Sequence, residues 1–420
     1  MSSQSYTAPV RLSIRVGDAR HRALLYHVAS SLFFSSVLDT SHTGLIYSQV
    51  KAGRLDLPSQ SRLRAHVFRS SHESQATLQT SDTNAVRDKI RGSILGGAIG
   101  DAMGGPLEGR PEGFAEAHYG GPVAELHPYL DRETFKPIPG RAAGEYTDDT
   151  RLKNILCTAM IDLGGRVTAE EFAEVWLRDM DPEFFYLSEK IAFYKLRFKR
   201  TIAREGGAGN VPACDADMMI SPVGLINACN PRQAGLDAFE VASVFQSGYS
   251  ATSACAIAAA VAQAMEPDAG LDQIIDAAIA NTDRLTAPAI QRSVELARAA
   301  SDFSAFKKSF YDELLIIPVD AIEVTSAVFG IIVAVDGDLR QGVIQAANFG
   351  RDCDTIAGIV GSILGALHGA SPLKQSWIDG VNKANPNPDL EQISYGIFGA
   401  LCNEIRKQIE YVEKLRWLLW

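Results

Sequence analysis

Two short acidic clusters carry the side chains with the clearest potential for chemistry. The first is Tyr146-Thr147-Asp148-Asp149-Thr150, and the second is Gly350-Arg351-Asp352-Cys353-Asp354-Thr355. Each directly precedes a segment with helical spacing, so a single Asp in each would be explained as a helix cap that complements the helix dipole. Capping explains paired Asp flanked by Thr at two helix starts poorly, because the second carboxylate mainly adds repulsion.

The second cluster leads into a helix with almost no polar surface, which predicts that its acids lie at a buried helix end. Buried like charges require compensating cations. Four carboxylates and two hydroxyls, with no His or paired Cys nearby, suit hard cations: Mg²⁺, or alternatively Mn²⁺ or Ca²⁺. Such a set could hold two ions close together. Helix caps and salt bridges are the alternative interpretation.

The segments that must position these clusters are predicted to be helices. From Arg87 onward, apolar residues recur at helical spacing, and a run of glycines within residues 92–100 indicates close approach of another helix or a ligand. Strand-like alternation is nearly absent after residue 87, so the expected fold class is all-α. Helices are expected over Arg151–Leu163, Ala169–Arg178, Ala238–Met265, Leu271–Ala280, Pro288–Ala300, Val319–Val335, Thr355–His368 and Ser394–Trp417.

Burial and loops can also be predicted. The segments 251–265 and 355–368 are apolar or small nearly all round, which predicts that they are buried at the centre of a helical assembly. The stretches Gly104–Thr147 and Gly206–Pro222 are long and rich in Gly and Pro. Loops of this length inside a domain tend to be lids or binding loops.

Composition excludes several classes of protein. The 420 residues are 46% hydrophobic and 21% charged, which excludes a mostly disordered chain, and no stretch reaches the ~18 apolar residues of a membrane span. The formal net charge is −10. Residues 1–86 carry +4, so residues 87–420 carry −14. An acidic body argues against a nucleic-acid groove. Six scattered Cys indicate reduced thiols.

The first 86 residues differ from the rest. They are rich in Ser and Arg and poor in acids, which resembles an organelle transit peptide, but a poorly ordered extension or upstream sequence outside the working domain is the favoured interpretation. We therefore expect an N-terminal extension over residues 1–86 and one domain over residues 87–420. The expected location is cytoplasmic, with organelle targeting by the extension as the alternative.

Three segments resemble the ADP-ribosylglycohydrolase family, which includes the ADP-ribosyl-arginine and ADP-ribosyl-serine hydrolases and the dinitrogenase-reductase-activating glycohydrolases. The run from Gly92 to Gly104 (GSILGGAIGDAMG), followed by Glu108, resembles the opening glycine-rich helix and its downstream glutamate. Thr147-Asp148-Asp149-Thr150 and Asp352-Cys353-Asp354-Thr355-Ile356-Ala357 resemble the two metal-ligand motifs. The resemblance spans about residues 87–370, and the three motifs in this order are specific.

The resemblance implies a compact, orthogonal multi-helix domain with two Mg²⁺ ions in a central cleft, Mn²⁺ being an alternative. It implies a hydrolase of ADP-ribosyl N- or O-glycosides. Glu108, Asp149 and Asp354 would be catalytic, and Glu108, Gly350, Asp217 and Met218 would contact the substrate. The implied metal ligands are Thr147, Asp148, Asp149, Asp352, Asp354 and Thr355.

The sequence also departs from the family. Many members carry Asn-Gly-x-x-Met-Arg in the substrate pocket, whereas the corresponding stretch here is Asp217-Met218-Met219-Ile220-Ser221-Pro222, with Met219 where Arg is expected. The sequence therefore predicts that the metal site is retained and that the residues which recognise the substrate differ from those of the family. Asp101 also matches a family position, but within a helix it is better explained as a structural hydrogen-bonding residue than as a catalyst.

Three hypotheses follow. The first is a Mg²⁺-dependent glycohydrolase acting on an ADP-ribosylated protein or an ADP-ribose-like small molecule, as a monomer or homodimer without membrane association. The second is the same metal scaffold recruited for another ribosyl or nucleotide transformation in specialised metabolism. The third is a non-catalytic, crystallin-like relative. Because all six implied ligands are present, the enzyme hypotheses are favoured.

Overall fold

Residues 83–419 are described in the structure, a computed structural model. Within this range there is no β-strand, only an isolated bridge between Leu130 and Pro137. The predicted all-α class is confirmed. Residues 1–82 of the predicted extension lie outside the described residues, and the first described helix runs over 83–104, across the boundary expected at residue 87.

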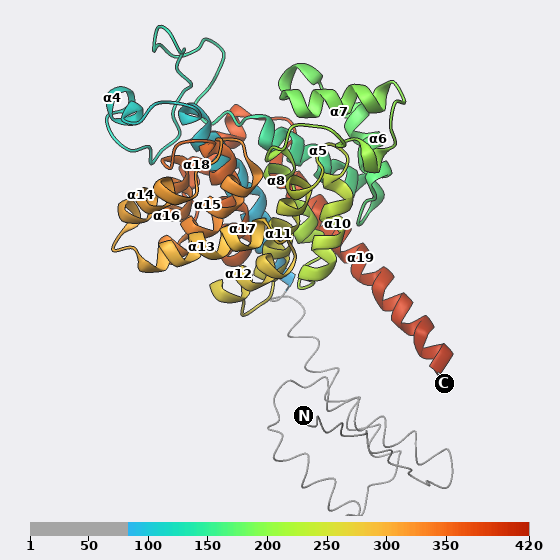
Figure 1. The fold of residues 1–420 in the computed structure, drawn as a ribbon. Coiled ribbons are helices and arrows are strands. Elements are labelled where there is room, and N and C mark those ends of the chain that lie inside the picture. The colour runs from blue at the N-terminus through green and yellow to red at the C-terminus, as the bar shows by residue number, and fades with distance from the viewer. Residues whose placement is uncertain (1–82, 420) are drawn as a thin grey trace, which may run out of the picture. The chain divides into compact units, whose positions relative to one another are not determined.

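Helices of varied length follow the first described helix along the chain (Figure 1). They are η1 (Gly105–Leu107), α4 (Phe114–Tyr119), α5 (Asp148–Leu163), α6 (Ala169–Asp179), η2 (Pro182–Phe184), α7 (Leu187–Arg197), η3 (Ala203–Glu205), α8 (Asp215–Met219), α9 (Ser221–Ile226), α10 (Pro231–Ala242), α11 (Tyr249–Ala264), α12 (Leu271–Ala280), α13 (Thr286–Ala299), α14 (Phe303–Glu313), α15 (Ala321–Ala334), α16 (Leu339–Ala347), α17 (Cys353–His368), α18 (Gln375–Ala384) and α19 (Leu390–Leu419). No helix within residues 83–419 is both long and apolar enough to cross a bilayer.

Two helices, α11 and α17, form the centre of the domain. Nearly every residue of each is buried, as their composition predicts. They pack against each other, α11 also contacts α9, α10 and α12, and α17 also contacts α15 and α16 (Figure 1). The first turn of α17 carries Asp354, so this acid enters the core together with the apolar helix.

The first described helix crosses α17 with the two backbones in contact. Contacts run in opposite directions along the two helices, from Gly92 with Gly365 through Gly96 with Gly361 and Gly100 with Ala357 to Gly104 with Asp354. A Cβ added at Gly100 would lie 2.1 Å from the Ala357 carbonyl oxygen, so only glycine permits this approach. The antiparallel crossing brings the end of the first described helix to the start of α17. Glu108, four residues after that end, is therefore also close to the start of α17.

Two expectations about elements were wrong. The single helix expected over Ala238–Met265 is two helices, α10 and α11, because the chain turns at Gly248, whose φ of +58° L side chains rarely adopt. The loop expected over Gly206–Pro222 contains α8 and the start of α9. Five residues of α8 are too few to show a helical period. Sequence periodicity also did not predict α7, α14, α16 or α18.

Candidate metal centre

Both acidic clusters lie at helix N-termini, as their spacing predicts. Thr147 caps α5 and its hydroxyl accepts a hydrogen bond from the Asp149 amide at 3.3 Å, while Asp148 and Asp149 occupy the first turn. Asp352 is the N-cap residue of α17, and Asp354 lies in its first turn. Free N–H groups and the positive end of the helix dipole therefore converge on these carboxylates.

Asp101, on the first described helix, holds the first cluster in place. Its Oδ1 accepts a hydrogen bond from the Thr147 amide at 2.9 Å. Its Oδ2 accepts from the Thr150 amide at 3.0 Å and from the Thr150 hydroxyl at 2.5 Å. Asp101 is fully buried. These bonds support the expectation that Asp101 is structural, because it anchors the start of α5 to the glycine-rich helix.

Glu108 joins the second cluster. One oxygen from each of the Glu108, Asp352 and Asp354 carboxylates lies within 4.8 Å of the others. The Asp354 and Asp352 residues are buried, whereas Glu108 is solvent-exposed at the edge of the group. Three carboxylates this close repel one another unless protons or a cation intervene. The arrangement therefore forms a possible acidic metal site that opens to solvent on the Glu108 side.

The pKa values of these carboxyls connect the two clusters. Desolvation, followed by the charges of Asp352 and Asp148, raises the pKa of Glu108 to about 7. Desolvation, with Asp101 and Asp352 among the nearby charges, raises the pKa of Asp148 to about 6. Burial also raises the pKa of Asp354 well above its usual value, with contributions from Glu108 and Asp149. All of these groups therefore share one electrostatic environment, although the two clusters are about 200 residues apart in sequence.

Two buried oxygens show that this environment fits a cation. Among the described residues, Oδ2 of Asp149 and Oδ1 of Asp354 are buried without a hydrogen-bond partner. Such atoms destabilise a folded protein unless they bind something. The buried Lys153, which interacts with Asp101 and Asp149, supplies one positive charge against several carboxylates. An oxygen-only donor set with unpartnered carboxylate oxygens is suited to Mg²⁺ or Mn²⁺.

A second group of polar residues lies against the clusters and was missed in the sequence. Cys214 donates a hydrogen bond from Sγ to Asp352 Oδ2 at 2.9 Å. Asp215 accepts one from Gln246 Nε2 at 2.8 Å, and the pKa of its carboxyl is raised to about 6 by desolvation. Glu189 on α7 is fully buried, and its charge interacts with Asp215. Proximity of Asp215 to the predicted pocket segment was a usable signal; nothing in the sequence marked Glu189.

The residues predicted to contact substrate have different environments. Gly350 lines a cavity of about 620 Å³ together with Leu107 and Arg351, the neighbours of Glu108 and Asp352. Met218 is buried in the core.

Asp217 has a role that we did not expect. It is fully buried, and its two oxygens accept hydrogen bonds from the hydroxyls of Ser253, at 2.7 Å, and Thr325, at 2.9 Å. Both oxygens are thus already bonded, and the side chain connects α8 to α11 and α15. This burial argues against the expected contact between Asp217 and substrate.

The loop before α17 is held by an ion pair. Arg351 has a φ of +64°, a strained conformation for a residue with a side chain. Its guanidinium donates to both carboxylate oxygens of the buried Glu323, at 2.6 and 2.8 Å. Its carbonyl accepts from the Gly109 amide at 3.3 Å, which ties the Glu108 loop to the second cluster. The surrounding structure thus holds Glu108 near Asp352.

We expect the cation-free chain to lose stability as the pH rises from about 4 to about 7. The folded-state pKa values of about 7 for Glu108 and about 6 for Asp148 and Asp215 lie above the usual 4.5 and 3.8. In this window the folded state binds protons that the unfolded state has released, so the free energy of unfolding falls with increasing pH. Melting temperatures in chelator at pH 5, 6, 7 and 8 check this expectation.

Saturating Mg²⁺ provides the control for that pH series, because a bound cation replaces the protons and should flatten the decline above pH 6. A melting temperature that rises steadily with pH in chelator would contradict the expectation.

The fold and this centre define a class: an all-α protein with a buried acidic centre where helix N-termini converge. Residues 82–409 match the family model for ADP-ribosylglycohydrolase, and the chain belongs to the ADP-ribosylglycohydrolase family. The resemblance of the three motifs is thereby confirmed. Membership implies a glycohydrolase with ADP-ribosylated substrates, in a family that is generally metal-dependent.

Two individual proteins are similar to this chain. The uncharacterized protein YegU of Escherichia coli (strain K12) is 25% identical over 299 residues, which cover 65% of this chain and 86% of that protein. A solved structure described as an ADP-ribosylglycohydrolase-related protein complex has a TM-score of 0.56 and 19% identity, and the match covers 76% of this chain and 99% of that one. At such low identity this structure supports the fold alone.

Proposed function

We propose that this chain is a Mg²⁺-dependent glycohydrolase that cleaves an N- or O-glycosidic ribosyl bond in an ADP-ribosylated or ADP-ribose-like substrate. The observation that carries the proposal is the pair of unpartnered buried oxygens, on Asp149 and Asp354, at two adjacent helix N-termini. The proposed ligands, with Mn²⁺ as the alternative ion, are Thr147, Asp148, Asp149, Asp352, Asp354 and Thr355.

A cation held there would supply positive charge that orients ribose hydroxyls and stabilises charge as the glycosidic bond breaks. The transition state of such a cleavage has oxocarbenium character, and a water molecule must be activated on one face of the sugar. Activation of this water removes a proton from it, and Glu108 is the residue best placed to accept that proton. It is exposed at the edge of the cluster, and a pKa of about 7 is close to the value that suits a general base near neutral pH.

A cavity lined by Leu107, Gly350 and Arg351, the sequence neighbours of Glu108 and Asp352, supports a substrate of nucleotide size. Its volume of about 620 Å³ lies within the range of ligand pockets, and its lining includes Arg110, Lys307 and Arg351 as well as Glu112 and Glu116. Mixed charges suit a substrate that carries both phosphate and a polar aglycone. Gly350, in this lining, has a φ of +83°, and an added Cβ there would lie 2.7 Å from the Tyr311 hydroxyl, so glycine is required by the fold of this wall.

Release of free ADP-ribose from arginine-, serine- and O-acetyl-linked substrates, with and without chelator, tests the proposal. We expect chelator to stop release, and Glu108→Gln to slow it about 100-fold or more, the usual contribution of a general base. The glutamine preserves shape and hydrogen bonding. Glu133→Gln is the matched control, because Glu133 is exposed, lies in the same segment between residues 104 and 147, and belongs neither to the 4.8 Å cluster nor to the cavity lining; it should change the rate little.

Cation binding must be measured alongside the rate, because Glu108 lies near the proposed ligands. Retained Mg²⁺ affinity with lost turnover would support a general base, whereas loss of both would make Glu108 a ligand. Turnover that is unchanged in Glu108→Gln would contradict the proposed role.

A second candidate is a different ribosyl or nucleotide transformation on the same cation site. The residues around α8 favour it, because Asp215 and Glu189 add buried carboxylates beside Asp148, and Met219 is fully buried where the family has Arg. Strong Mg²⁺ binding without ADP-ribose release from any of the three substrates would favour this candidate. Absence of turnover in a wider substrate screen would favour the non-catalytic, crystallin-like alternative.

A further inference from the structure

Helix α19 begins in the core and ends outside it. Its first half is buried through Leu390, Ile393, Ile397 and Leu401, and it packs on α5 and α9. After Glu404 every residue of the helix up to Leu419 is exposed. Figure 1 shows this second half projecting from the helical body to the C-terminal end. An isolated helix of this length is marginal in water, so a contact with another surface would stabilise it.

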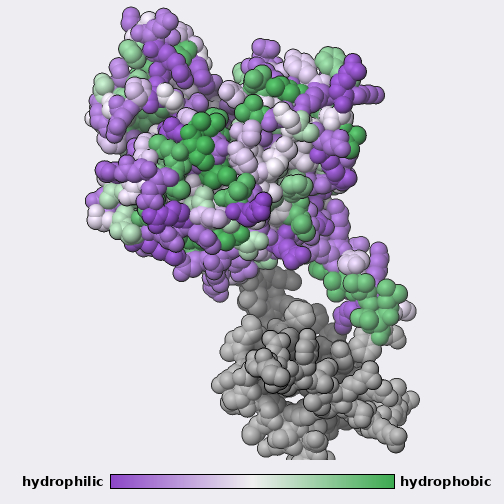
Figure 2. Space-filling view, viewed as in Figure 1, coloured by the Kyte–Doolittle hydropathy of each residue, from purple (hydrophilic) through white to green (hydrophobic). Residues whose placement is uncertain are grey.

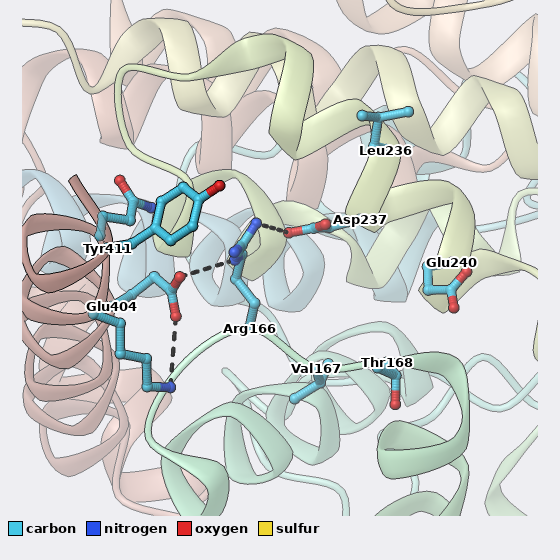
Figure 3. Close-up of a pocket in the computed structure, with 10 residues that line it drawn as sticks. Arg166, Val167, Thr168, Leu236, Asp237, Glu240, Glu404 and Tyr411 are labelled. Atoms are coloured by element: carbon cyan, nitrogen blue, oxygen red, sulfur yellow. Dashed lines mark hydrogen bonds and ion pairs between the residues drawn. The ribbon is translucent and has the colours of Figure 1, made fainter. Parts of the chain in front are cut away.

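An ion-pair network fixes the direction in which α19 leaves the body (Figure 3). Arg166 donates from Nε to Glu404 Oε1 at 3.0 Å, and its Nη1 lies 3.8 Å from Asp237 Oδ2. Lys407 Nζ lies 3.6 Å from the second oxygen of Glu404. Because Glu404 is buried, this network joins α19 to α10 and to the segment before α6 where the helix leaves the body, and Lys407 also donates from Nζ to the Gly164 carbonyl at 3.3 Å. The projecting turns are therefore held away from the core.

The projecting turns carry a stripe of large apolar side chains, here called the terminal stripe. Each member is at least 38% exposed, and Leu418 is 81% exposed. By helical spacing, Tyr411, Leu415 and Leu418 continue the face by which the first half of α19 packs on the core, and Ile405, Ile409 and Val412 lie on the face beside it. Figure 2 shows apolar residues gathered on this arm. The terminal stripe consists of Ile405, Ile409, Tyr411, Val412, Leu415, Leu418 and Leu419.

We propose that the terminal stripe pairs with the terminal stripe of a second copy of this chain, in an antiparallel two-helix contact. Ile405, Ile409, Val412 and Leu419 recur at spacings of four, three and seven residues, which is the heptad seam of a coiled coil. In an antiparallel pair whose two-fold axis passes between Ile409 and Val412, Ile409 of each copy faces Val412 of the other. Antiparallel pairing also leaves the two bodies at opposite ends.

Charge complementarity supports a second copy as the occupant. Arg406 and Glu413 are seven residues apart and flank the seam on the same side, so in this register Arg406 lies diagonally across the seam from Glu413 of the second copy, and the two-fold axis repeats this pair. Arg416 comes opposite Ile405, where its aliphatic stem can cover the apolar side chain while the guanidinium reaches water. Glu410 and Lys407 lie away from the seam. One sequence thus supplies both halves of an apolar seam and of two flanking ion pairs.

The interface extends beyond the seam. A standard stable interface buries about 800 Å² on each partner. The four seam residues and Leu415 beside them are 38% to 79% exposed and lose surface in the pair, whereas Tyr411 and Leu418 lie on the side of the helix away from the seam. In the antiparallel arrangement the end of one arm lies beside the base of the other, where Leu236 and Phe239 of α10 are 59% and 48% exposed. This second contact would enlarge the interface.

Sedimentation velocity of the full-length chain at about 1–50 µM tests the pairing, which does not depend on the proposed enzymatic function. We expect a dimer, and Ile409→Glu with Val412→Glu should raise the dimer dissociation constant about 100-fold or more. Both side chains are exposed, so the substitutions should leave the melting temperature of the monomer unchanged. A wild-type chain that stays monomeric, or a dimer that is insensitive to this double substitution, would overturn the proposal.

A charge-swap series tests the register. Arg406→Glu and Glu413→Arg should each weaken the dimer about threefold to tenfold, because each places like charges opposite one another twice. The double variant R406E/E413R restores both opposite-charge pairs and should return the dissociation constant to within about twofold of the wild type. Glu410→Arg is the matched control: it makes the same charge change as Glu413→Arg on the outer face and should have little effect. Equal weakening in the control and the seam variants, or no recovery in the double variant, would refute the antiparallel register.

Discussion

Asp354→Asn is expected to abolish binding of Mg²⁺ and, at the same time, to raise the melting temperature of the cation-free chain. Asp354 is buried, one of its oxygens has no hydrogen-bond partner among the described residues, and its carboxylate shares a 4.8 Å cluster with those of Glu108 and Asp352. In the absence of a cation this negative charge destabilises the folded state, so removing it should raise the free energy of unfolding by about 1–3 kcal/mol.

The opposite signs of the two effects separate a metal centre from an ordinary helix cap. For a chain of this size, 1–3 kcal/mol corresponds to a rise of about 1–4 °C in the melting temperature measured in chelator. Calorimetric titration should show Mg²⁺ affinity reduced at least about 100-fold, because one of the few charged ligands is lost.

Asp338→Asn is the matched control for that experiment. Asp338 caps α16 in a conventional way, with its side chain accepting a hydrogen bond from the Gln341 amide at 2.8 Å. Asn caps helices about as well as Asp, so stability and Mg²⁺ affinity should hardly change. Unchanged Mg²⁺ affinity in Asp354→Asn, or a lowered melting temperature in chelator, would show that Asp354 is a structural cap and not a ligand.

Gly100→Ala is expected to be strongly destabilising, although it adds only one methyl group. The added Cβ would lie 2.1 Å from the carbonyl oxygen of Ala357 and 2.9 Å from the Gly358 amide nitrogen. Both are backbone atoms of the buried helix α17, so no side chain can rotate away and the helices must separate. Overpacking of this kind costs about 1–3 kcal/mol and more where the backbone cannot move. Thermal and denaturant unfolding measure the loss.

This substitution should also weaken binding of Mg²⁺ at the acidic centre, although residue 100 is not one of the proposed ligands. Gly104 and Asp354 form the last contact of the same crossing, so moving the first described helix away from α17 displaces Glu108 from Asp354. We expect Mg²⁺ affinity to fall together with stability.

Gly399→Ala is the matched control, since nothing among the described residues lies within 4 Å of the added Cβ and the residue is exposed in α19. There Ala should stabilise the helix by up to about 1 kcal/mol. Equal effects of the two substitutions would mean that helix propensity, and not the crossing, sets the need for glycine at residue 100.

Much of the candidate site could be predicted because its parts are local. The motif Thr147-Asp148-Asp149-Thr150 and the Asp352–Thr355 segment each combine a helix start with an excess of carboxylates, and both signals depend only on neighbouring residues. Apolar composition all round predicted the burial of α17 correctly. The glycines at residues 92–100 predicted a close approach, which the structure shows to be the crossing with α17.

Other features could not be predicted because they depend on contacts between distant segments. Asp217 lies in a segment that resembles a substrate pocket, yet its carboxylate is used by hydroxyls from α11 and α15, more than 30 and 100 residues away. Glu189 belongs to a helix with no motif, and only the packing of α7 brings it to Asp215. The division between α10 and α11 depends on one backbone angle at Gly248.

By itself, the sequence determined the all-α class, the positions of the acidic helix starts and membership in the ADP-ribosylglycohydrolase family, because periodicity, capping and motif order are all written along the chain. Only the tertiary structure decided which carboxylates share one environment and which are already bonded. A helix crossing places residues about 250 positions apart in contact, as with Gly104 and Asp354, and electrostatic coupling falls off with distance in space, not along the chain. For the same physical reason, the exposure of the terminal stripe could not be predicted from the sequence. It follows from the tertiary structure, in which α19 extends beyond the core that its first half packs against.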